Sequence, residues 1–103
     1  MDLRLRDGHL TGPQLRYALI VLLVEARREV TTSELVAGLD ANGFRVRGRP
    51  SKAVSDALRW EVRRGRVRRC GRGVYAAGAM SRATAWRMTQ RVRTLRAQVV
   101  AQT

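Results

Sequence analysis

The apolar stretch over residues 15–26 constrains the fold of this chain more than any other feature. It follows Thr11 and Gln14, which have the T-x-x-Q spacing of a capping box, and Pro13 lies in what would be the first turn. These signals predict a helix that runs to about Arg28. A helix that is apolar on most faces is either the central helix of a core or one whose spare face meets another subunit. We therefore expect one domain organised around this helix.

Two further helices are predicted by their start and stop signals. A short strand is expected at Val30 and Thr31, and Thr31 also opens a second capping box, T-x-x-E, which ends at Glu34. Pro50 opens the third helix, and Gly65 is its natural stop. The buried arc of the third helix is expected to contain Val54, Ala57, Leu58, Glu61 and Val62.

After the third helix the pattern changes to that of strands. Residues 66–70 (RVRRC) and 74–77 (VYAA) flank the turn sequence GRG at 71–73, which is typical of a β-hairpin. Ser81 can then cap a final helix. The expected fold class is therefore mainly α with a small β-hairpin. One face of the last helix carries apolar residues with the 3-4-3-4 spacing of a coiled-coil seam, which are Ala85, Met88, Val92, Leu95 and Val99.

The basic residues are concentrated in the later part of the chain. Residues 1–44 hold five arginines and six acids, a net charge of −1, whereas residues 45–103 hold sixteen basic residues and two acids, a net charge of +14. Such an excess of like charges repels itself unless a partner neutralises it, and nucleic acid is the commonest polyanion.

The single Cys70 and the single His9 exclude a zinc cluster and an internal disulfide, and no apolar run is long enough to span a bilayer.

Three segments carry a resemblance to a known superfamily: TTSELVAGL in the second helix, PSKAVSDALRWEVRRG in the third, and RVRRCGRGVYAAG in the hairpin. Their order resembles the winged helix-turn-helix of small bacterial regulators and antitoxin repressors, and the hairpin is similar to the wing of linker-histone-like domains. The resemblance implies that the third helix enters the major groove while the wing lies along the backbone or minor groove. It divides the chain into an N-terminal arm (1–10), a winged-helix DNA-binding domain (11–78) and a C-terminal amphipathic helix (79–103).

The resemblance also implies the residues that would contact DNA. One of them, Asp56, departs from a purely basic face. Asp56 either pairs with Lys52 or Arg59 one turn away or accepts a hydrogen bond from cytosine. If it does neither, it repels phosphate, and the helix then recognises DNA less well than the resemblance implies. On the recognition helix and the wing the resemblance implies Lys52, Ser55, Asp56, Arg59, Arg63, Arg68, Arg69 and Arg72. The basic connector and the start of the third helix add Arg45, Arg47, Gly48, Arg49 and Ser51 to the expected DNA-binding residues.

The connector before the third helix contains the sequence RGRP at residues 47–50, which matches the core of an AT-hook. In such a core the glycine lets the backbone lie flat in a narrow minor groove, and the flanking arginines extend along the groove floor. The alternative is a basic connector that contacts only phosphates, because four residues are a weak signal and the proline is also explained as a helix start.

Together these features indicate a homodimeric protein that binds double-stranded DNA, either a transcriptional repressor or a nucleoid-associated protein in the cytoplasm. The seam of the last helix indicates self-association, but its arginines disfavour a close parallel pair, which leaves antiparallel or splayed pairing, or packing onto the first helix. An alternative of another class is an antitoxin or adaptor module that grips an acidic protein. We expect no enzyme activity, cofactor, metal or membrane partner. Trp60 and Trp86 are expected to pack against neighbouring helices.

Overall fold

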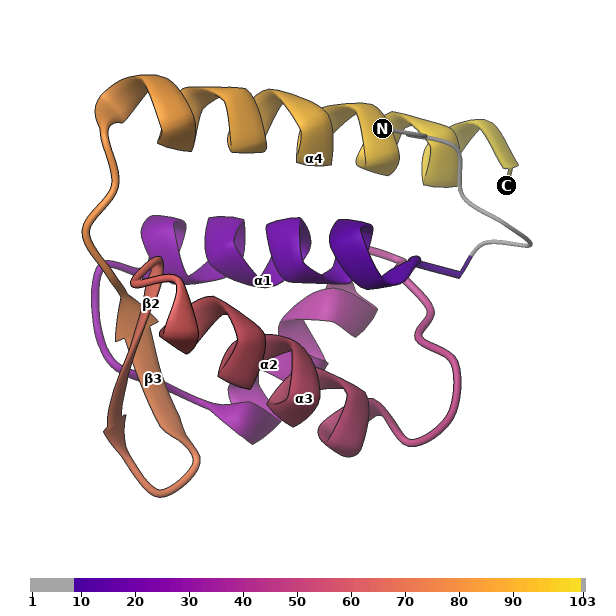
Figure 1. The fold of residues 1–103 in the computed structure, drawn as a ribbon. Helices are drawn as coiled ribbons and strands as arrows, with labels where there is room; N and C mark the ends of the chain where they lie inside the picture. Colours follow the sequence, from indigo (N-terminus) through magenta and orange to yellow (C-terminus); the bar gives the residue numbers. More distant parts are fainter. Residues whose placement is uncertain (1–8, 103) are drawn as a thin grey trace.

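The computed structural model describes residues 9–102, which form four helices and a small antiparallel sheet (Figure 1). The mainly α fold class with a small β-element is therefore confirmed. The arm expected over residues 1–10 lies outside the described residues, apart from His9 and Leu10. In chain order the elements are α1 (Gly12–Ala26), β1 (Val30–Thr31), α2 (Thr32–Ala41), α3 (Pro50–Arg63), β2 (Val67–Gly71), β3 (Val74–Ala77) and α4 (Arg82–Gln102).

Reciprocal capping boxes begin both α1 and α2, as the sequence predicts. At α1 the backbone N–H of Thr11 donates to Gln14 Oε1 (2.8 Å), and the backbone N–H of Gln14 donates to Thr11 Oγ1 (3.4 Å). Thr31 and Glu34 make the same two bonds at α2, both 3.1 Å long. Each box satisfies backbone donors that the first turn of a helix leaves without a partner.

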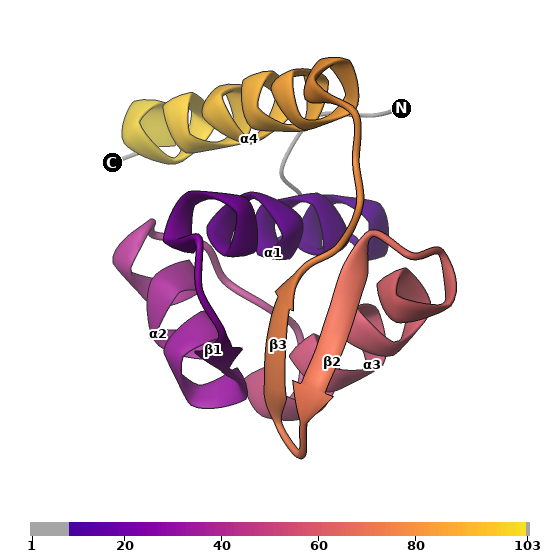
Figure 2. The same ribbon diagram turned by 90° about the vertical axis from the view of Figure 1, so that its left-hand side faces the viewer.

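α1 is the central helix of the fold. In both views α4 lies on one side of it, and α2 and α3 lie on the other (Figures 1 and 2). Leu19, Ile20 and Leu23 are at most 1% exposed, so the expected burial on most faces is confirmed. The helix stops before the expected Arg28 because Arg27 takes a left-handed conformation, with a φ of 54°, which ends the run of helical dihedrals.

The hairpin expected after α3 is present, and the short strand β1 joins it. The sheet has the order β1-β3-β2, and both pairings are antiparallel. Val30 of β1 lies opposite Tyr75 of β3, and both side chains enter the core. The two-residue strand after α1 therefore completes one sheet with the hairpin.

The chain leaves the sheet through Gly78, at a close approach of two backbone segments. The N–H of Gly78 donates to the carbonyl oxygen of Arg66 (2.8 Å), and a β-carbon on Gly78 would collide with the carbonyl oxygen of Gly65. Only glycine fits such an approach. The chain then enters α4, where Ser81 Oγ accepts a hydrogen bond from the backbone N–H of Thr84 (3.1 Å), as expected of a capping serine.

α4 packs along α1 through its 3-4-3-4 seam. Met88, Val92 and Leu95 are at most 4% exposed, and Ala85 and Val99 are half-buried. The seam therefore occupies, within the chain, the packing onto the first helix that the sequence left open. Homodimerisation through these five residues stays a prediction, and it would require α4 to leave α1.

Candidate nucleic-acid interface

The outer face of α3 lies at the centre of the expected DNA-binding set. Lys52, Asp56, Arg59 and Arg63 are exposed on this helix, and Ser55 is half-buried. Lys52 Nζ donates to Asp56 Oδ2 at 2.9 Å. This hydrogen bond and the charge of Lys52, with a smaller contribution from Arg59, lower the pKa of Asp56 below its usual range. Of the roles left open for Asp56, the pairing with Lys52 is the one present, and it holds the lysine along the helix.

The connector that leads into α3 is exposed and bent. Leu10 donates its backbone N–H to the carbonyl oxygen of Arg45 (2.9 Å), which ties the connector to the residue before the α1 cap. Gly48 has a φ of 75°, so the RGRP segment turns at this residue. The flat backbone expected of an AT-hook would require this turn to open. The expected residues exposed here and in the first turn of α3 are Arg45, Arg47, Gly48, Arg49 and Ser51.

The hairpin presents its arginines on two different faces. Arg69 lies opposite Tyr75 in register, and both line a shallow hollow together with Arg59 of α3. Arg68 is the preceding residue of β2 and therefore projects to the other face. Its Nε donates to the carbonyl oxygen of Ala77 (3.3 Å). The structure thus brings Arg69 to the α3 face and separates Arg68 from it.

Arg72 occupies the turn of the hairpin and is exposed. The next residue, Gly73, has a φ of 69°, a left-handed conformation that tight hairpin turns require. The carbonyl oxygen of Gly73 also accepts hydrogen bonds from the backbone N–H (3.0 Å) and the hydroxyl (3.4 Å) of Thr32. The turn is therefore fixed to the first residue of α2, and Arg72 has a defined position.

Trp60 lies on the flank of α3 that faces the start of α1 and the connector. Its side chain is 43% exposed, and the guanidinium groups of Arg16 and Arg64 each lie over its ring at 5.1 Å from the ring centre. Sequence reasoning did not include Arg64, although its spacing of four from Trp60 on one helix is a usable signal. The expectation of packing against a neighbouring helix is wrong for Trp86, which is 64% exposed on α4.

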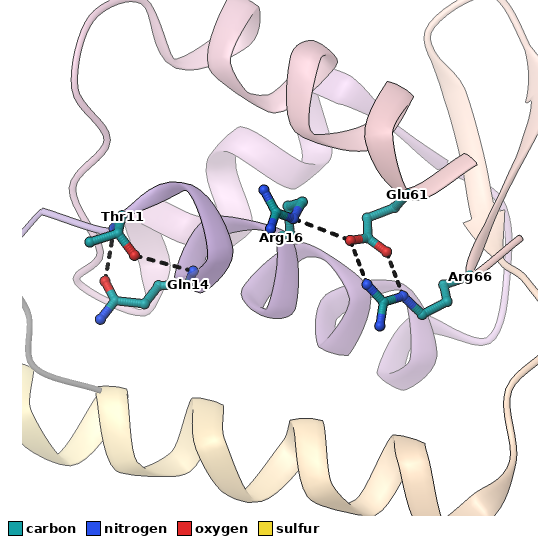
Figure 3. A network of polar contacts seen from close by, with 5 residues as sticks. All are labelled: Thr11, Gln14, Arg16, Glu61 and Arg66. Atoms are coloured by element: carbon teal, nitrogen blue, oxygen red, sulfur yellow. Dashed lines mark hydrogen bonds and ion pairs between the residues drawn. The ribbon is translucent and has the colours of Figure 1, made fainter. Parts of the chain in front are cut away.

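Behind the exposed face, Glu61 fastens α3 to α1 and to the start of the hairpin (Figure 3). This residue is 1% exposed. Arg66 donates to its carboxylate through Nε (2.6 Å) and Nη2 (2.9 Å), and Arg16 Nε lies 3.3 Å from Oε1. The sequence placed Glu61 on the buried arc but did not identify these partners. The two hydrogen bonds from Arg66 are directional and orient the carboxylate, and the ion pair with Arg16 links this point of α3 to α1.

Neither a metal site nor a membrane-spanning segment is found within residues 9–102. That part of the chain has no group of three or more His, Cys, Asp or Glu residues that could hold a metal, and no helix long and apolar enough to cross a bilayer. No protein-family model, curated protein or solved structure matches the chain. The chain's own charge and geometry therefore carry the functional inference.

Proposed function

We propose that this chain is a winged helix-turn-helix DNA-binding protein that acts in the cytoplasm, at the nucleoid, as a transcriptional repressor or a nucleoid-associated protein. Two features support this fold: the helix–strand–helix–helix–hairpin order, and the pairing of the first strand with the second strand of the hairpin. In a winged helix, α3 would be the recognition helix and the β2–β3 hairpin the wing. α4 would be an addition to that module.

The observation that carries the proposal is a basic surface that extends over the connector, α3 and the hairpin, in which Asp56 is the exposed acid and Asp40 of α2 borders Arg45. Arg59 of α3 and Arg69 of the hairpin line the same hollow, so the helix and the hairpin form one surface. The acid, Asp56, is held by Lys52. Exposed arginines with so few acids among them are typical of a face that binds the phosphate backbone. The exposed basic residues of this α3–hairpin face are Arg45, Arg47, Arg49, Lys52, Arg59, Arg63, Arg69 and Arg72.

Within this surface we assign base contacts to α3 and phosphate contacts to its surroundings. The major groove of DNA admits an α-helix, and Lys52, Ser55 and Arg59 would meet base edges there. Arg69 and Arg72 on the hairpin would contact the backbone. A repressor depends on the base contacts, whereas a nucleoid-associated protein can rely on phosphates and groove width.

Electrophoretic mobility shifts with random, A·T-rich and G·C-rich duplexes over a series of salt concentrations test the proposal. With about six phosphates neutralised, the logarithm of the binding constant should fall against the logarithm of salt concentration with a slope near −5. Similar affinity for the three duplexes favours the nucleoid-associated role, and a strong preference favours the repressor. A slope near zero, or no shift at low salt, contradicts DNA binding and favours an acidic protein partner.

A matched pair of variants separates the α3 face from charge in general. Arg59→Gln and Arg27→Asn each remove one exposed arginine, and asparagine tolerates the left-handed conformation of Arg27. Arg59→Gln should reduce the magnitude of the salt slope by about 1 and weaken binding roughly tenfold. Arg27→Asn should leave both nearly unchanged. Equal effects of the two variants would show that α3 is not the interface.

A further inference from the structure

The outer face of α4 is a second basic surface, separate from the α3–hairpin face. α4 lies on the side of α1 opposite to α2 and α3 (Figures 1 and 2). Its sequence over residues 82–102 holds five arginines and no acid. Three of these arginines, Arg82, Arg87 and Arg93, are exposed. The chain therefore presents arginines on both sides of its central helix.

The two other arginines of α4 are used within the fold. Arg91 lies over the ring of Tyr17, at 5.4 Å from its centre, and Arg96 Nη2 lies 3.5 Å from Glu25 Oε1. Both partners belong to α1. Among the described residues, no acid forms an ion pair with any of the three exposed arginines of α4. Their charge is therefore available to a partner outside the chain.

An exposed tryptophan lies among these charges. At 100° per residue, Arg82, Trp86 and Arg93 fall within about 40° of one another around the helix, and Arg82 and Arg93 are separated by about 16 Å along its axis. Arg87 lies about 100° around the helix from Trp86, on the other flank of the outer face. Trp86 is 64% exposed. Guanidinium groups suit phosphates, and an indole ring offers a flat apolar surface to the sugars and bases between them. Arginines around an exposed indole ring are therefore a combination that complements the phosphates, sugars and bases of a nucleic acid.

The charge of α4 also argues against a second copy of this chain as the occupant. Because the helix carries no acid, two such faces brought together would set arginine against arginine. The apolar residues that would favour self-association, Met88, Val92 and Leu95, are already buried against α1. A strong polyanion is the partner that this face complements.

We propose that the outer face of α4 binds the backbone of a second DNA duplex, so that one chain bridges two duplexes on opposite sides of α1. This inference rests on the proposed function, because the first duplex is the one held by the α3–hairpin face. It adds a separate site with its own residues, and it favours the nucleoid-associated role over the repressor.

A capture assay tests bridging with the full chain. A duplex fixed on beads is saturated with protein, and a fluorescent duplex of different sequence is then added in solution. The wild type should retain the fluorescent duplex. The triple variant Arg82→Gln, Arg87→Gln, Arg93→Gln should bind the fixed duplex within about threefold of the wild-type affinity, yet its retention of the fluorescent duplex should fall at least tenfold. Arg27→Asn, which removes none of the exposed arginines of α4 or of the α3–hairpin face, should behave as the wild type.

The outcomes separate this inference from the proposed function. If the wild type binds the fixed duplex but captures no second duplex, bridging is wrong and DNA binding stands. If no duplex is bound at low salt, the proposed function fails first. Capture that survives in the triple variant also overturns the assignment to α4. Sedimentation without DNA completes the test, because a wild-type dimer that the triple variant converts to a monomer would assign bridging to a dimer.

Trp86 supplies a direct optical reading of the second site. In the variant Trp60→Phe it is the only tryptophan of the chain, and its exposed ring should emit like a solvated indole. The second equivalent of duplex should quench or shift this emission, and this change should be lost at high salt. An emission that stays constant beyond the first equivalent would overturn the proposal.

Discussion

α3 and α4 lie on opposite sides of the same central helix, and both carry arginines outward, but they are attached by different forces. α3 is joined to its neighbours by apolar contacts and by Glu61, whose buried carboxylate meets two guanidinium groups. α4 is joined by an apolar row centred on Val92 and Leu95, and its ionic contact with α1 is exposed. Hydrogen bonds to a buried charge constrain the orientation of the groups they join, whereas an apolar row constrains only which side of a helix is buried. The helix assigned to base contacts is the one that carries a buried, hydrogen-bonded carboxylate.

Removing the polar attachment of α3 should have the largest effect. We expect Glu61→Ala to lower the free energy of unfolding by about 3–5 kcal/mol, because it leaves two guanidinium groups without their buried carboxylate. Urea denaturation measures this change. Glu25→Ala is the control, since it removes an ion pair at a half-exposed carboxylate and should cost at most about 1 kcal/mol. Equal losses in the free energy of unfolding for the two variants would show that α3 is not attached more strongly by its polar contacts than α4 is.

Removing an apolar contact of α4 should come next. Leu95→Ala is expected to cost about 3 kcal/mol in the free energy of unfolding, since the side chain is fully buried against α1. Thr94→Ala, at an exposed neighbouring position, should change the free energy by less than about 0.5 kcal/mol. Under native conditions Leu95→Ala should leave the mobility shift of a single duplex unchanged. A weakened shift would show that α4 helps to position α3.

The acid on the outer face of α3 sharpens the comparison further, since α4 has none. Asp56→Asn should raise the affinity for mixed-sequence DNA about threefold at low salt, because a carboxylate facing phosphates is removed and Lys52 is released. Mobility shifts measure the change, and Glu29→Gln, another exposed acid, is the control. A loss of affinity that is confined to G·C-containing sites would instead assign Asp56 to cytosine.

The smallest expected effect is a pH dependence at the start of α2. The hydrogen bond from Arg28, followed by that from the backbone N–H of Thr31, lowers the pKa of Glu34 to about 2. In the unfolded chain this carboxyl has a pKa of about 4.3, so its stabilising contribution is complete above that pH and is lost as the pH falls toward 2. Denaturation curves of the wild type and Glu34→Gln should therefore converge across this range. A constant difference would show that the charge of Glu34 does not stabilise the fold.

Local features of the fold could be predicted from the sequence because their partners lie close along the chain. The capping boxes at Thr11 and Thr31 each join residues three positions apart, so their spacing alone identifies them. The same holds for the turn glycine Gly73 and for Pro50 at the start of α3. The exposed basic face of α3 also followed from helical periodicity.

Features that depend on distant partners could not be predicted in the same way. The seam of α4 is equally apolar whether it meets α1 or another chain, so its pattern does not choose between them. Glu61 was recognised as lying on an apolar arc, but Arg16 comes from a helix far away in the sequence. Arg68 and Arg69 are successive residues of a strand, so alternation alone places them on opposite faces. Which of the two lies on the α3 face follows only from the register of β2 and β3, in which Arg69 is opposite Tyr75.

The backbone crossing at Gly78 has a consequence for engineering this molecule. A main-chain hydrogen bond and the lack of room for a side chain fix the point at which the chain leaves the sheet, four residues before α4 begins. The helix that follows Ser81 can therefore be replaced while the chain at Gly78 stays fixed to the sheet. A longer helix attached after Ser81 would extend the reach of its outer surface by about 1.5 Å for each added residue. The α3–hairpin face would keep its geometry throughout such a series, so the reach of α4 could be varied independently of that face.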